Sequence, residues 1–328
     1  MPTILDVASR AGVGVGTVSR VLNNSEHVTE ATRDKVNAAI AELDYRPSSA
    51  ARALSSGRSS FVPVFATNVT LPSTTPRLAG ILDVVDELHE IVLCEVAGPI
   101  QRAGFVERHS GRLPAFGVLA ISLHLDESEI AAFDAAEVPL VSIDYEIDGV
   151  PSLVIDDVAA AATATQHLLD LGHTEIAFLG DKDSGDYRTR ASVQRRSGYR
   201  TALRSAGVSP RPGLEHSVTK SKKQAAAELL GRASRPTAVI TDADSTALCL
   251  LAVARSMGLS VPRDLSVVGF DDLWAAGAAG LTTVAQPLEE SGRLGASMLF
   301  SAASGEAVPT LTTLRTELIV RETSGPPS

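Results

Sequence analysis

Two short segments at the start of the chain place apolar residues three or four positions apart, the spacing of one face of a helix. The first covers residues 3–11, where Thr3 stands in the N-cap position and Gly12 follows the last apolar residue. The second covers roughly 15–22 and begins after a short turn. The pattern predicts two short helices joined by a tight turn, which is a helix-turn-helix arrangement.

A third helical pattern follows, and then a segment of a different kind. Thr29 precedes EATRDKVNAAIAELDY, whose apolar residues form a stripe, and Pro47 is expected to end this helix. Residues 48–60, SSAARALSSGRSS, hold small residues and a single large apolar one, which is typical of a linker with some helical tendency. We therefore expect a three-helix head over residues 1–47 and a hinge segment over 48–60.

Residues 61–328 alternate short β-rich runs with helical runs, which predicts parallel sheets with helices on both faces. The strands are too many for one typical sheet, so we expect an α/β body of two similar lobes with a cleft at the carboxyl ends of the strands. The expected strands are FVPVFA, IVLCEV, FGVLAIS, PLVSID, LVID, TEIAFLG, TAVITD, LSVVGFDD and LTTVAQP. The expected helices cover, notably, 157–171, 188–206, 222–233, 244–258 and 288–303.

Charge is distributed unevenly along the chain, whose formal net charge is −10. Residues 1–58 carry seven Lys and Arg against six Asp and Glu, whereas the remainder carries 22 against 33. Because an acidic body repels phosphate at long range, any contact with nucleic acid belongs to the nearly neutral head.

The sequence also bears on the compartment. No apolar run approaches the roughly 18 residues that a membrane-spanning helix needs, and the N-terminus lacks the pattern of a secretion signal. Cys94 and Cys249 lie far apart within apolar runs, which is typical of buried reduced thiols. We expect a cytoplasmic protein.

The second predicted helix contains residues that favour helices little. Gly14 suits an N-cap, but Gly16 costs about 1 kcal/mol relative to Ala in a helix interior. In exchange, Gly16 removes side-chain bulk at the start of this helix. In a helix-turn-helix unit the second helix lies in the major groove of DNA, so this bare end suits close approach to the bases.

Several stretches carry a resemblance to a known family. TILDVASRAGVGVGTVSRVLNNSEHVTEATRDKVNAAIAELDYRPSSAARAL resembles, without a gap, the head of lactose-repressor-type (LacI/GalR) transcription regulators. The resemblance continues in QHLLDLGHTEIAFLG, RRSGYRTALRSAGV, VPRDLSVVGFDD and LTTVAQPLEESGRLGASML. It implies a two-lobed, periplasmic-binding-protein-like body and a homodimer on a near-palindromic operator in double-stranded DNA. It further implies a regulator, most simply a repressor, whose operator affinity is controlled by a sugar, sugar phosphate or related metabolite.

The resemblance assigns contacts to DNA residue by residue. Val15 and Gly16 match base-reading positions, and Arg20 can pair bidentately with a guanine. Leu54 matches an apolar wedge that enters the minor groove, and Ala51 is a small neighbour that lets two hinge segments approach. The positions that match phosphate contacts are Thr3, Thr17, Ser19, Asn23 and Thr29.

The resemblance also assigns effector contacts. Arg195 and Asp271 match the strongest ligand positions, and Asp244 and, more weakly, Asp144 match others. Structural alternatives remain open: an ion pair for Arg195, a hinge or capping role for Asp271, and an N-cap for Asp244. The residues imply an effector cleft but do not fix its chemistry.

Three departures from the family's pattern concern the effector. The stretch TNVTLPSTTP has no aromatic residue, Ala243 stands where Asn is usual, and the segment between IVLCEV and FGVLAIS is short, which predicts a truncated helix. Trp274 either supplies an aromatic face to the ligand or packs in the hinge region. The cluster TKSKKQ is either a solvated face or an aid to an anionic effector approaching Arg195.

No catalytic pattern is present. The sequence has no G-x-S-x-G, H-E-x-x-H or P-loop, no G-x-G-x-x-G after a strand, and no histidines at metal-ligand spacing. We expect neither an enzyme nor a cofactor or metal site. Two alternatives stay open: the same regulator with a degenerate, non-sugar or unresponsive pocket, and a sugar-handling enzyme with an accessory head.

Overall fold

The computed structural model describes residues 2–22, 27–45, 59–96, 98–111, 114–183, 190–209, 211 and 213–328. Contacts divide the chain into two compact units, residues 1–60 with 112–115 and residues 61–111 with 116–328. The predicted hinge segment 48–60 lies outside the described residues except for Ser59 and Ser60.

The first unit is a three-helix head. Helix α1 starts after a capping box, in which the Thr3 hydroxyl accepts from the Asp6 backbone N–H while the Asp6 carboxylate accepts from Thr3. Buried residues from all three helices form one small core, which the apolar spacing predicted. The helices are α1 (Ile4–Ala11), α2 (Val15–Leu22) and α3 (Glu30–Glu42). The core residues are Val7, Ala8, Val18, Val21, Val36, Ala39 and Tyr45.

Helix α3 ends earlier than predicted. It stops at Glu42, whereas the sequence suggested that it would continue to Pro47. Asp44 adopts a positive φ of 44°, and the Tyr45 N–H donates to the Ile40 carbonyl. This turn brings the Tyr45 ring back into the core, so burial of an aromatic side chain ends the helix before proline can.

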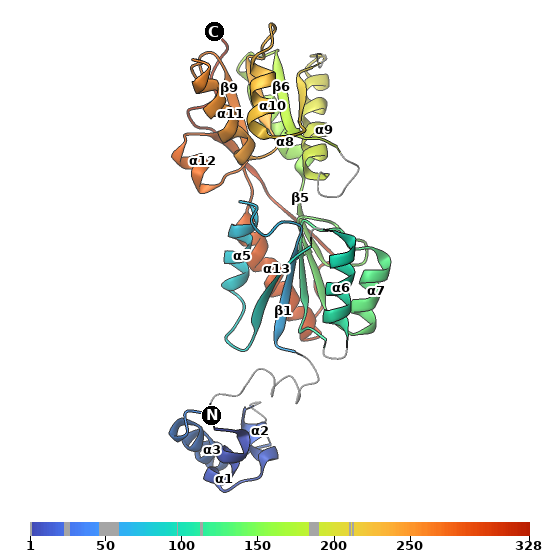
Figure 1. Ribbon diagram of the computed structural model, residues 1–328, viewed down its shortest axis with the longest axis vertical. Helices are drawn as coiled ribbons and strands as arrows, with labels where there is room; N and C mark the ends of the chain where they lie inside the picture. Colours follow the sequence, from blue (N-terminus) through green and yellow to red (C-terminus); the bar gives the residue numbers. More distant parts are fainter. Residues whose placement is uncertain are drawn as a thin grey trace. The chain divides into compact units, whose positions relative to one another are not determined.

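The second unit consists of two lobes, each built on a six-stranded sheet with helices on both faces (Figure 1). Lobe 1 has strand order β11-β5-β4-β3-β1-β2, and lobe 2 has order β12-β10-β9-β8-β6-β7. Lobe 1 contains β1 (Phe61–Ala66), α5 (Thr74–Leu82), β2 (Glu90–Glu95), α6 (Pro99–Ser110), β3 (Val118–Ile121), α7 (Glu127–Ala135), β4 (Leu140–Ile143), β5 (Ser152–Ile155), α13 (Leu288–Ala303) and β11 (Leu311–Leu314). Lobe 2 contains α8 (Asp157–Asp170), β6 (Ile176–Asp181), α9 (Arg190–Ser205), β7 (Glu215–Val218), α10 (Lys222–Leu230), β8 (Ala238–Thr241), α11 (Asp244–Ser256), β9 (Ser266–Asp271), α12 (Trp274–Ala278), β10 (Thr282–Ala285) and β12 (Glu317–Ile319).

The layers follow from the apolar patterns of the strands. Strands β1, β3, β4, β6, β8 and β9 are almost entirely buried, as expected for parallel strands covered on both faces. In lobe 2, α8 and α9 cover one face of the sheet while α10 and α11 cover the other. In lobe 1, α5 and α13 lie on one face, and α6 and α7 lie on the other (Figure 1).

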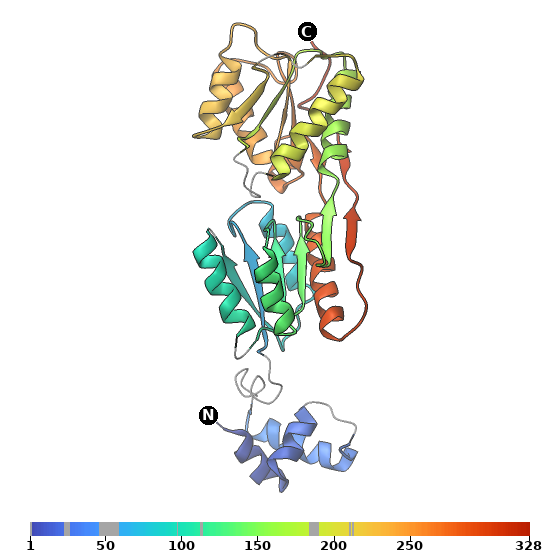
Figure 2. The same ribbon diagram turned by 90° about the vertical axis from the view of Figure 1, so that its right-hand side faces the viewer.

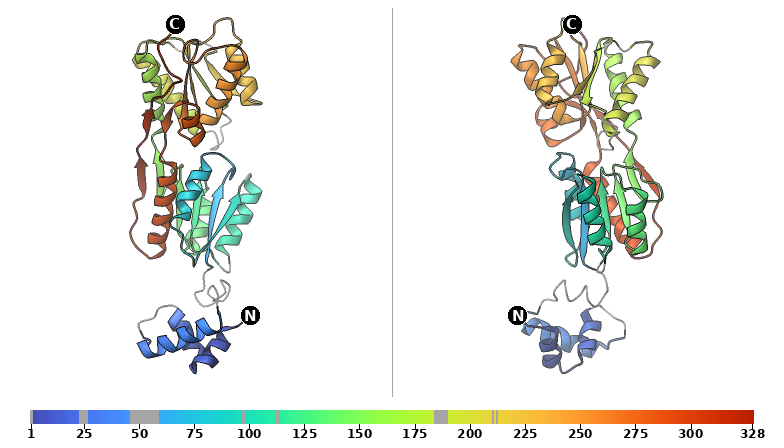
Figure 3. Two further views of the ribbon diagram at one scale, coloured as in Figure 1. Left: turned by 90° about the vertical axis from the view of Figure 1, so that its left-hand side faces the viewer. Right: turned by 45° about the vertical axis from the view of Figure 1, so that its right-hand side comes forward.

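The chain passes between the lobes three times, after β5, after β10 and after β11 (Figures 2 and 3). Lobe 1 therefore takes its last helix and one edge strand from the C-terminal part of the chain. The parallel strands of each sheet end toward the other lobe, which fixes where a cleft can form.

The sequence missed three strands. Strands β7, β11 and β12 lie at sheet edges and are only partly buried, so they lack the apolar runs that marked the others. The segment expected to hold a truncated helix contains α6, which is twelve residues long.

Helices α5 and α13 of lobe 1 approach each other through glycine. A Cβ added at Gly80 would fall inside contact distance of the Glu289 carbonyl, and one at Gly292 would overlap the Arg77 carbonyl. Neither glycine has a positive φ, so close backbone approach explains both. This packing holds α5 against α13, the helix that follows the second crossing between the lobes.

We predict that Gly80→Ala destabilises the protein by about 1–3 kcal/mol, because the new methyl group would press on backbone that cannot move aside without separating the helices. Urea unfolding measures the change. Gly104→Ala on α6 is the matched control, since its Cβ would meet nothing within 4 Å. The control should be neutral or stabilising by up to about 1 kcal/mol, and equal effects of the two substitutions would contradict the tight crossing.

Candidate functional site

One face of α2 is not used by the packing of the head. Val18 and Val21 are buried in the head core, whereas Val15, Gly16 and Arg20 are exposed. A Cβ at Gly16 would meet nothing within 4 Å, and Gly16 has no positive φ. The fold of the head therefore does not require a glycine at this position. The physical explanation that remains is that the missing side chain lets a partner approach the backbone of α2.

Arg20 extends from the exposed face of α2. Within the part of the chain that the structure describes, its guanidinium has no ion pair, unlike Arg10, which pairs with Glu42 at 2.5 Å. Its donors are available to an outside acceptor. Its placement near Val15 and Gly16 on one face agrees with the geometry that the resemblance implies.

The predicted phosphate contacts differ in how they are engaged. Thr17 and Ser19 on α2 are half-buried. The Thr3 hydroxyl already takes part in the capping box, and the Thr29 hydroxyl lies 2.9 Å from that of Thr32. Hydrogen bonds from Thr3 lower the pKa of Asp6. The predicted contacts Asn23, Ala51 and Leu54 lie outside the described residues.

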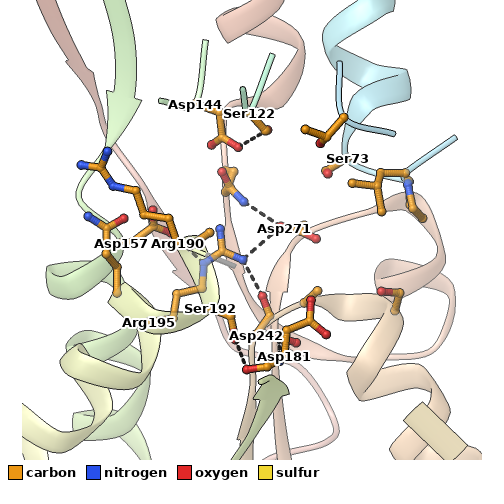
Figure 4. Close-up of a pocket in the computed structure, with 18 of the residues that line it drawn as sticks. Ser73, Ser122, Asp144, Asp157, Asp181, Arg190, Ser192, Arg195, Asp242 and Asp271 are labelled. Atoms are coloured by element: carbon orange, nitrogen blue, oxygen red, sulfur yellow. Dashed lines mark hydrogen bonds and ion pairs between the residues drawn. The ribbon is translucent and has the colours of Figure 1, made fainter. Parts of the chain in front are cut away.

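Between the lobes, the carboxyl ends of both sheets line a cleft of about 170 Å³ (Figure 4). Its lining is polar and highly charged. Lobe 1 contributes residues from α5 and from the segments after β3 and β4, and lobe 2 contributes residues from α8, α9, α10 and the ends of β6, β8 and β9. The charged lining residues are Arg77, Arg190, Arg195, Lys222, Asp144, Asp157, Asp181, Asp242 and Asp271.

Arg195 of α9 lies at the floor of this cleft, as predicted, and is 6% exposed. Its Nε donates to Asp157 at 2.7 Å, and its Nη1 donates to the Asp242 carbonyl. The guanidinium also stacks on the Phe270 ring, 3.6 Å from the centroid. Burial opposes its charge, but the carboxylates of Asp157 and Asp271 outweigh burial and raise the pKa of Arg195. The ion pair that the sequence left open as an alternative exists, and it holds the guanidinium in the cleft (Figure 4).

Asp271 ends β9 in the middle of the cleft, with a strained φ of 120°. The Gln286 side chain donates to its Oδ1 at 2.6 Å, and Arg195 Nη1 lies 3.8 Å from the same oxygen. Burial raises the pKa of Asp271 to about 7, against the opposing charge of Arg195. Asp271 therefore changes protonation near neutral pH, where it can act as an acceptor or as a donor.

The lobe 1 side of the floor contains a charged pair that only partly follows from the sequence. Asp144, with φ of 70°, pairs with Arg77 at 2.9 Å and accepts from the Ser122 hydroxyl at 2.6 Å. Arg77 was not predicted, although an arginine within the mostly apolar helix TTPRLAGIL is a signal for it. It is 3% exposed, so lobe 1 contributes a second buried guanidinium.

Two buried polar atoms in the floor have no hydrogen-bond partner among the described residues: Arg77 Nε and Gln286 Oε1. Both residues line the cleft, and both also line a small hole of about 10 Å³ beside it. An unpaired buried donor or acceptor costs roughly 1–3 kcal/mol. One donor and one acceptor are thus positioned for a hydroxyl group or a water molecule.

The structure corrects two predicted effector contacts. Asp244 is fully buried and does not line the cleft, because its oxygens accept from the Leu273 N–H at 2.8 Å and the Thr283 hydroxyl at 2.6 Å. Burial raises its pKa to about 6.

Trp274 is 87% exposed and does not line the cleft, but it lines an adjoining apolar groove that shares Asp271 and Gln286 with the cleft. Asp242, two residues before Asp244, is the carboxylate that reaches the cleft.

The lysine cluster is only partly in the cleft. Lys222 lines the cleft and donates to the Ser245 hydroxyl, whereas Lys220 and Lys223 are exposed. The lining carboxylates match or outnumber the lining cations, and burial and the nearby Asp242 raise the pKa of Asp181. This balance does not favour an anionic ligand.

Other features of the described residues bear on alternative functions. No group of three or more His, Cys, Asp or Glu side chains in the described ranges is arranged to hold a metal ion. In the same ranges, no helix has the length and apolar character needed to cross a bilayer. Cys94 is buried against His109, and burial raises its pKa to about 11, which makes it a poor nucleophile.

A helix-turn-helix head joined to a two-lobed body with an interlobe cleft is the architecture of a DNA-binding regulator. The model for bacterial regulatory proteins of the lacI family matches residues 3–48, and the model for a periplasmic binding protein-like domain matches residues 165–324. Among curated proteins, the transcriptional regulator CelR of Thermobifida fusca is 38% identical over 98% of both chains, and the ribose operon repressor of Escherichia coli is 33% identical over 91% of this chain and 92% of its own.

Among solved structures, a Lac repressor dimer bound to operator and the anti-inducer ONPF has a TM-score of 0.81 at 28% identity, covering 99% of each chain. A CelR–cellobiose complex has a TM-score of 0.70 at 34% identity, covering 98% of this chain and all of that one. The chain belongs to the LacI family of transcriptional regulators. Its relatives are regulators rather than enzymes, so the prediction that it is not an enzyme is confirmed.

We predict that Asp271→Asn flattens the dependence of stability on pH. The folded protein holds a proton on Asp271 up to about pH 7, well above the ordinary pKa of 3.8, so wild-type stability should fall as pH rises from about 4 to about 7. The slope for one proton approaches about 1.4 kcal/mol per pH unit. Urea unfolding at pH 5 and pH 8 measures it, with Asp134→Asn on the exposed face of α7 as control. Identical slopes in wild type and Asp271→Asn would contradict the burial argument.

Proposed function

We propose that this regulator binds a near-palindromic operator as a homodimer to repress transcription, and that a small molecule in the interlobe cleft controls operator affinity. The observation that carries the proposal is the exposed face of α2, where Val15, Gly16 and Arg20 lie together without serving the core of the head. A bacterial protein that binds an operator acts in the cytoplasm, which is the location that we propose.

The chemistry of α2 suits major-groove reading. Arg20 can donate two hydrogen bonds to O6 and N7 of a guanine, and Val15 can contact a thymine methyl group. Thr17 and Ser19, half-buried on the same helix, are placed to donate to phosphates at the edges of the groove. The bare backbone at Gly16 lets the helix start approach the bases.

A dimer is supported by exposed apolar side chains on both lobes. Leu82, Leu88 and Leu93 are at least half exposed in lobe 1, and Trp274 and Met257 are exposed in lobe 2. These side chains are available for burial in an interface between two copies of the chain. The similar Lac repressor structure is a dimer on its operator, which supports the same assembly here.

For the effector, we propose an uncharged sugar or a similar hydroxyl-rich molecule. The cleft presents carboxylates, guanidinium groups and hydroxyls whose charges nearly balance, which suits hydroxyl groups better than an anion. The similar CelR is described in complex with cellobiose, and another relative is named the ribose operon repressor. Cellobiose and ribose are therefore the first probes.

We predict that Arg20→Ala relaxes base preference at one base pair in each operator half-site, by about 1–3 kcal/mol of discrimination. The operator is first selected from random duplexes, and binding of single-base variants is then measured by fluorescence anisotropy. Arg10→Ala is the matched control, because Arg10 is an exposed arginine of α1 that pairs with Glu42. A uniform loss of affinity for all sequences in Arg20→Ala would show that Arg20 contacts only phosphate.

We also predict that an uncharged sugar shifts operator affinity by about 5- to 150-fold, which corresponds to a coupling of 1–3 kcal/mol. Operator binding is titrated with cellobiose, ribose and glucose 6-phosphate. A response to the phosphorylated sugar alone would refute the neutral-effector proposal. Indifference to every sugar would favour a degenerate pocket, and chemical turnover of a sugar would favour the enzyme alternative.

A further inference from the structure

The cleft contains an aromatic face that the sequence did not reveal. Of the described residues that line it, Tyr145 is the one with an aromatic ring, and it comes from lobe 1, directly after Asp144. The Ser142 hydroxyl donates to the Tyr145 carbonyl, and the His124 ring lies 5.4 Å from the Tyr145 ring. These contacts hold the ring at the wall of lobe 1, where it could support the flat face of a ligand.

In the structure, this face is already occupied. Arg190, the first residue of α9 in lobe 2, places its guanidinium 4.4 Å from the centroid of the Tyr145 ring. That distance is a direct cation–π contact, which leaves no room for another ring between the two groups. The contact joins the wall of one lobe to the wall of the other.

Arg190 is held differently from the two arginines of the floor. Arg77 and Arg195 each pair with a carboxylate within 3 Å, whereas among the described residues the contact of Arg190 is with the Tyr145 ring. A half-exposed cation–π contact is weak compared with a buried ion pair. Arg190 can therefore leave its place at modest cost, while Arg77 and Arg195 stay in position.

The space beside the stack is narrow. The cleft measures about 170 Å³ and adjoins the larger groove of about 880 Å³ that Trp274 lines, with Asp271 and Gln286 lining both. Moving Arg190 away from Tyr145 would enlarge the cleft and expose the ring. A ligand with a flat apolar face, such as a pyranose ring, would then take the place of the guanidinium.

We propose that the stack of Arg190 on Tyr145 is an internal latch, which connects the two walls of the cleft and competes with the effector for the Tyr145 ring. The competition rests on the proposed function, since it requires an effector in this cleft. The latch concerns only the contact between the two walls. Arg190 thus lowers the affinity of the cleft for every flat ligand. Only a ligand that stacks on Tyr145 more strongly than the guanidinium does would displace it.

The first experiment tests the latch without any ligand. Hydrogen–deuterium exchange is compared in the segment around Tyr145 and the first turn of α9 for wild type, Arg190→Ala and Arg190→Lys. We expect faster exchange in both segments for Arg190→Ala and near-wild-type exchange for Arg190→Lys, which can still place a cation over the ring. Arg204→Ala, an exposed arginine farther along α9, is the control. Unchanged exchange in Arg190→Ala would overturn the latch.

The second experiment tests competition by calorimetric titration with cellobiose and ribose. Arg190→Ala should bind a stacking sugar about 2- to 30-fold more tightly than wild type, the range expected from loss of one cation–π contact. Tyr145→Leu should weaken binding, and Tyr145→Phe should restore it. Weaker binding by Arg190→Ala would mean that Arg190 contacts the ligand itself, which overturns the competition.

The two experiments separate the two proposals. If neither wild type nor Arg190→Ala binds either sugar, the sugar-effector proposal fails and the competition fails with it, while the exchange measurement still decides the latch. A sugar that binds Arg190→Ala but not wild type would support both halves of the inference.

Discussion

Buried charge at the carboxyl ends of the two sheets is the constraint on which the effector cleft depends. Arg195 is fixed by Asp157, the Asp242 carbonyl and the Phe270 ring, and Arg77 is fixed by Asp144. Removing one partner of a buried pair typically costs 3–5 kcal/mol. Contacts within the protein therefore fix the positions of both guanidinium groups. A ligand has to fit donors whose positions do not depend on it.

The same constraint reaches the connections between the lobes. Gln286 follows β10 at the second crossing and donates to Asp271, and α13 begins two residues later. Helix α13 is locked to α5 by the close approach at Gly80 and Gly292, and α5 carries Arg77. A change at Asp271, in protonation or in ligand contact, thus acts on the segment between β10 and α13, and α13 packs against the helix that carries Arg77.

Elements of the fold and residues of the site could be predicted from the sequence where neighbouring residues alone determine them. The helices of the head and the buried strands were predictable from spacing and apolar runs, whereas α3 ends at Glu42 because Tyr45 turns back into the core. The partly exposed edge strands gave no such signal. Arg195 and Asp271 were placed by resemblance, but Arg77 and Tyr145 meet them only through the folding of separate segments. Asp244 was misassigned because burial, which decides its role, is not visible in a motif.

Under the proposed function, weak interactions inside the cleft are sufficient to control DNA binding. The head is nearly neutral and the body is acidic, so long-range attraction to DNA is small and affinity must come from short-range contacts made by two heads together. Such paired contacts are sensitive to small changes in the separation of the heads, because simultaneous binding is lost when geometry forbids it. A cation–π contact of about 0.5–2 kcal/mol is of the same order as a typical allosteric coupling of 1–3 kcal/mol. Arg190 stacked on Tyr145 therefore has the energy scale needed to set the balance between two states of the body.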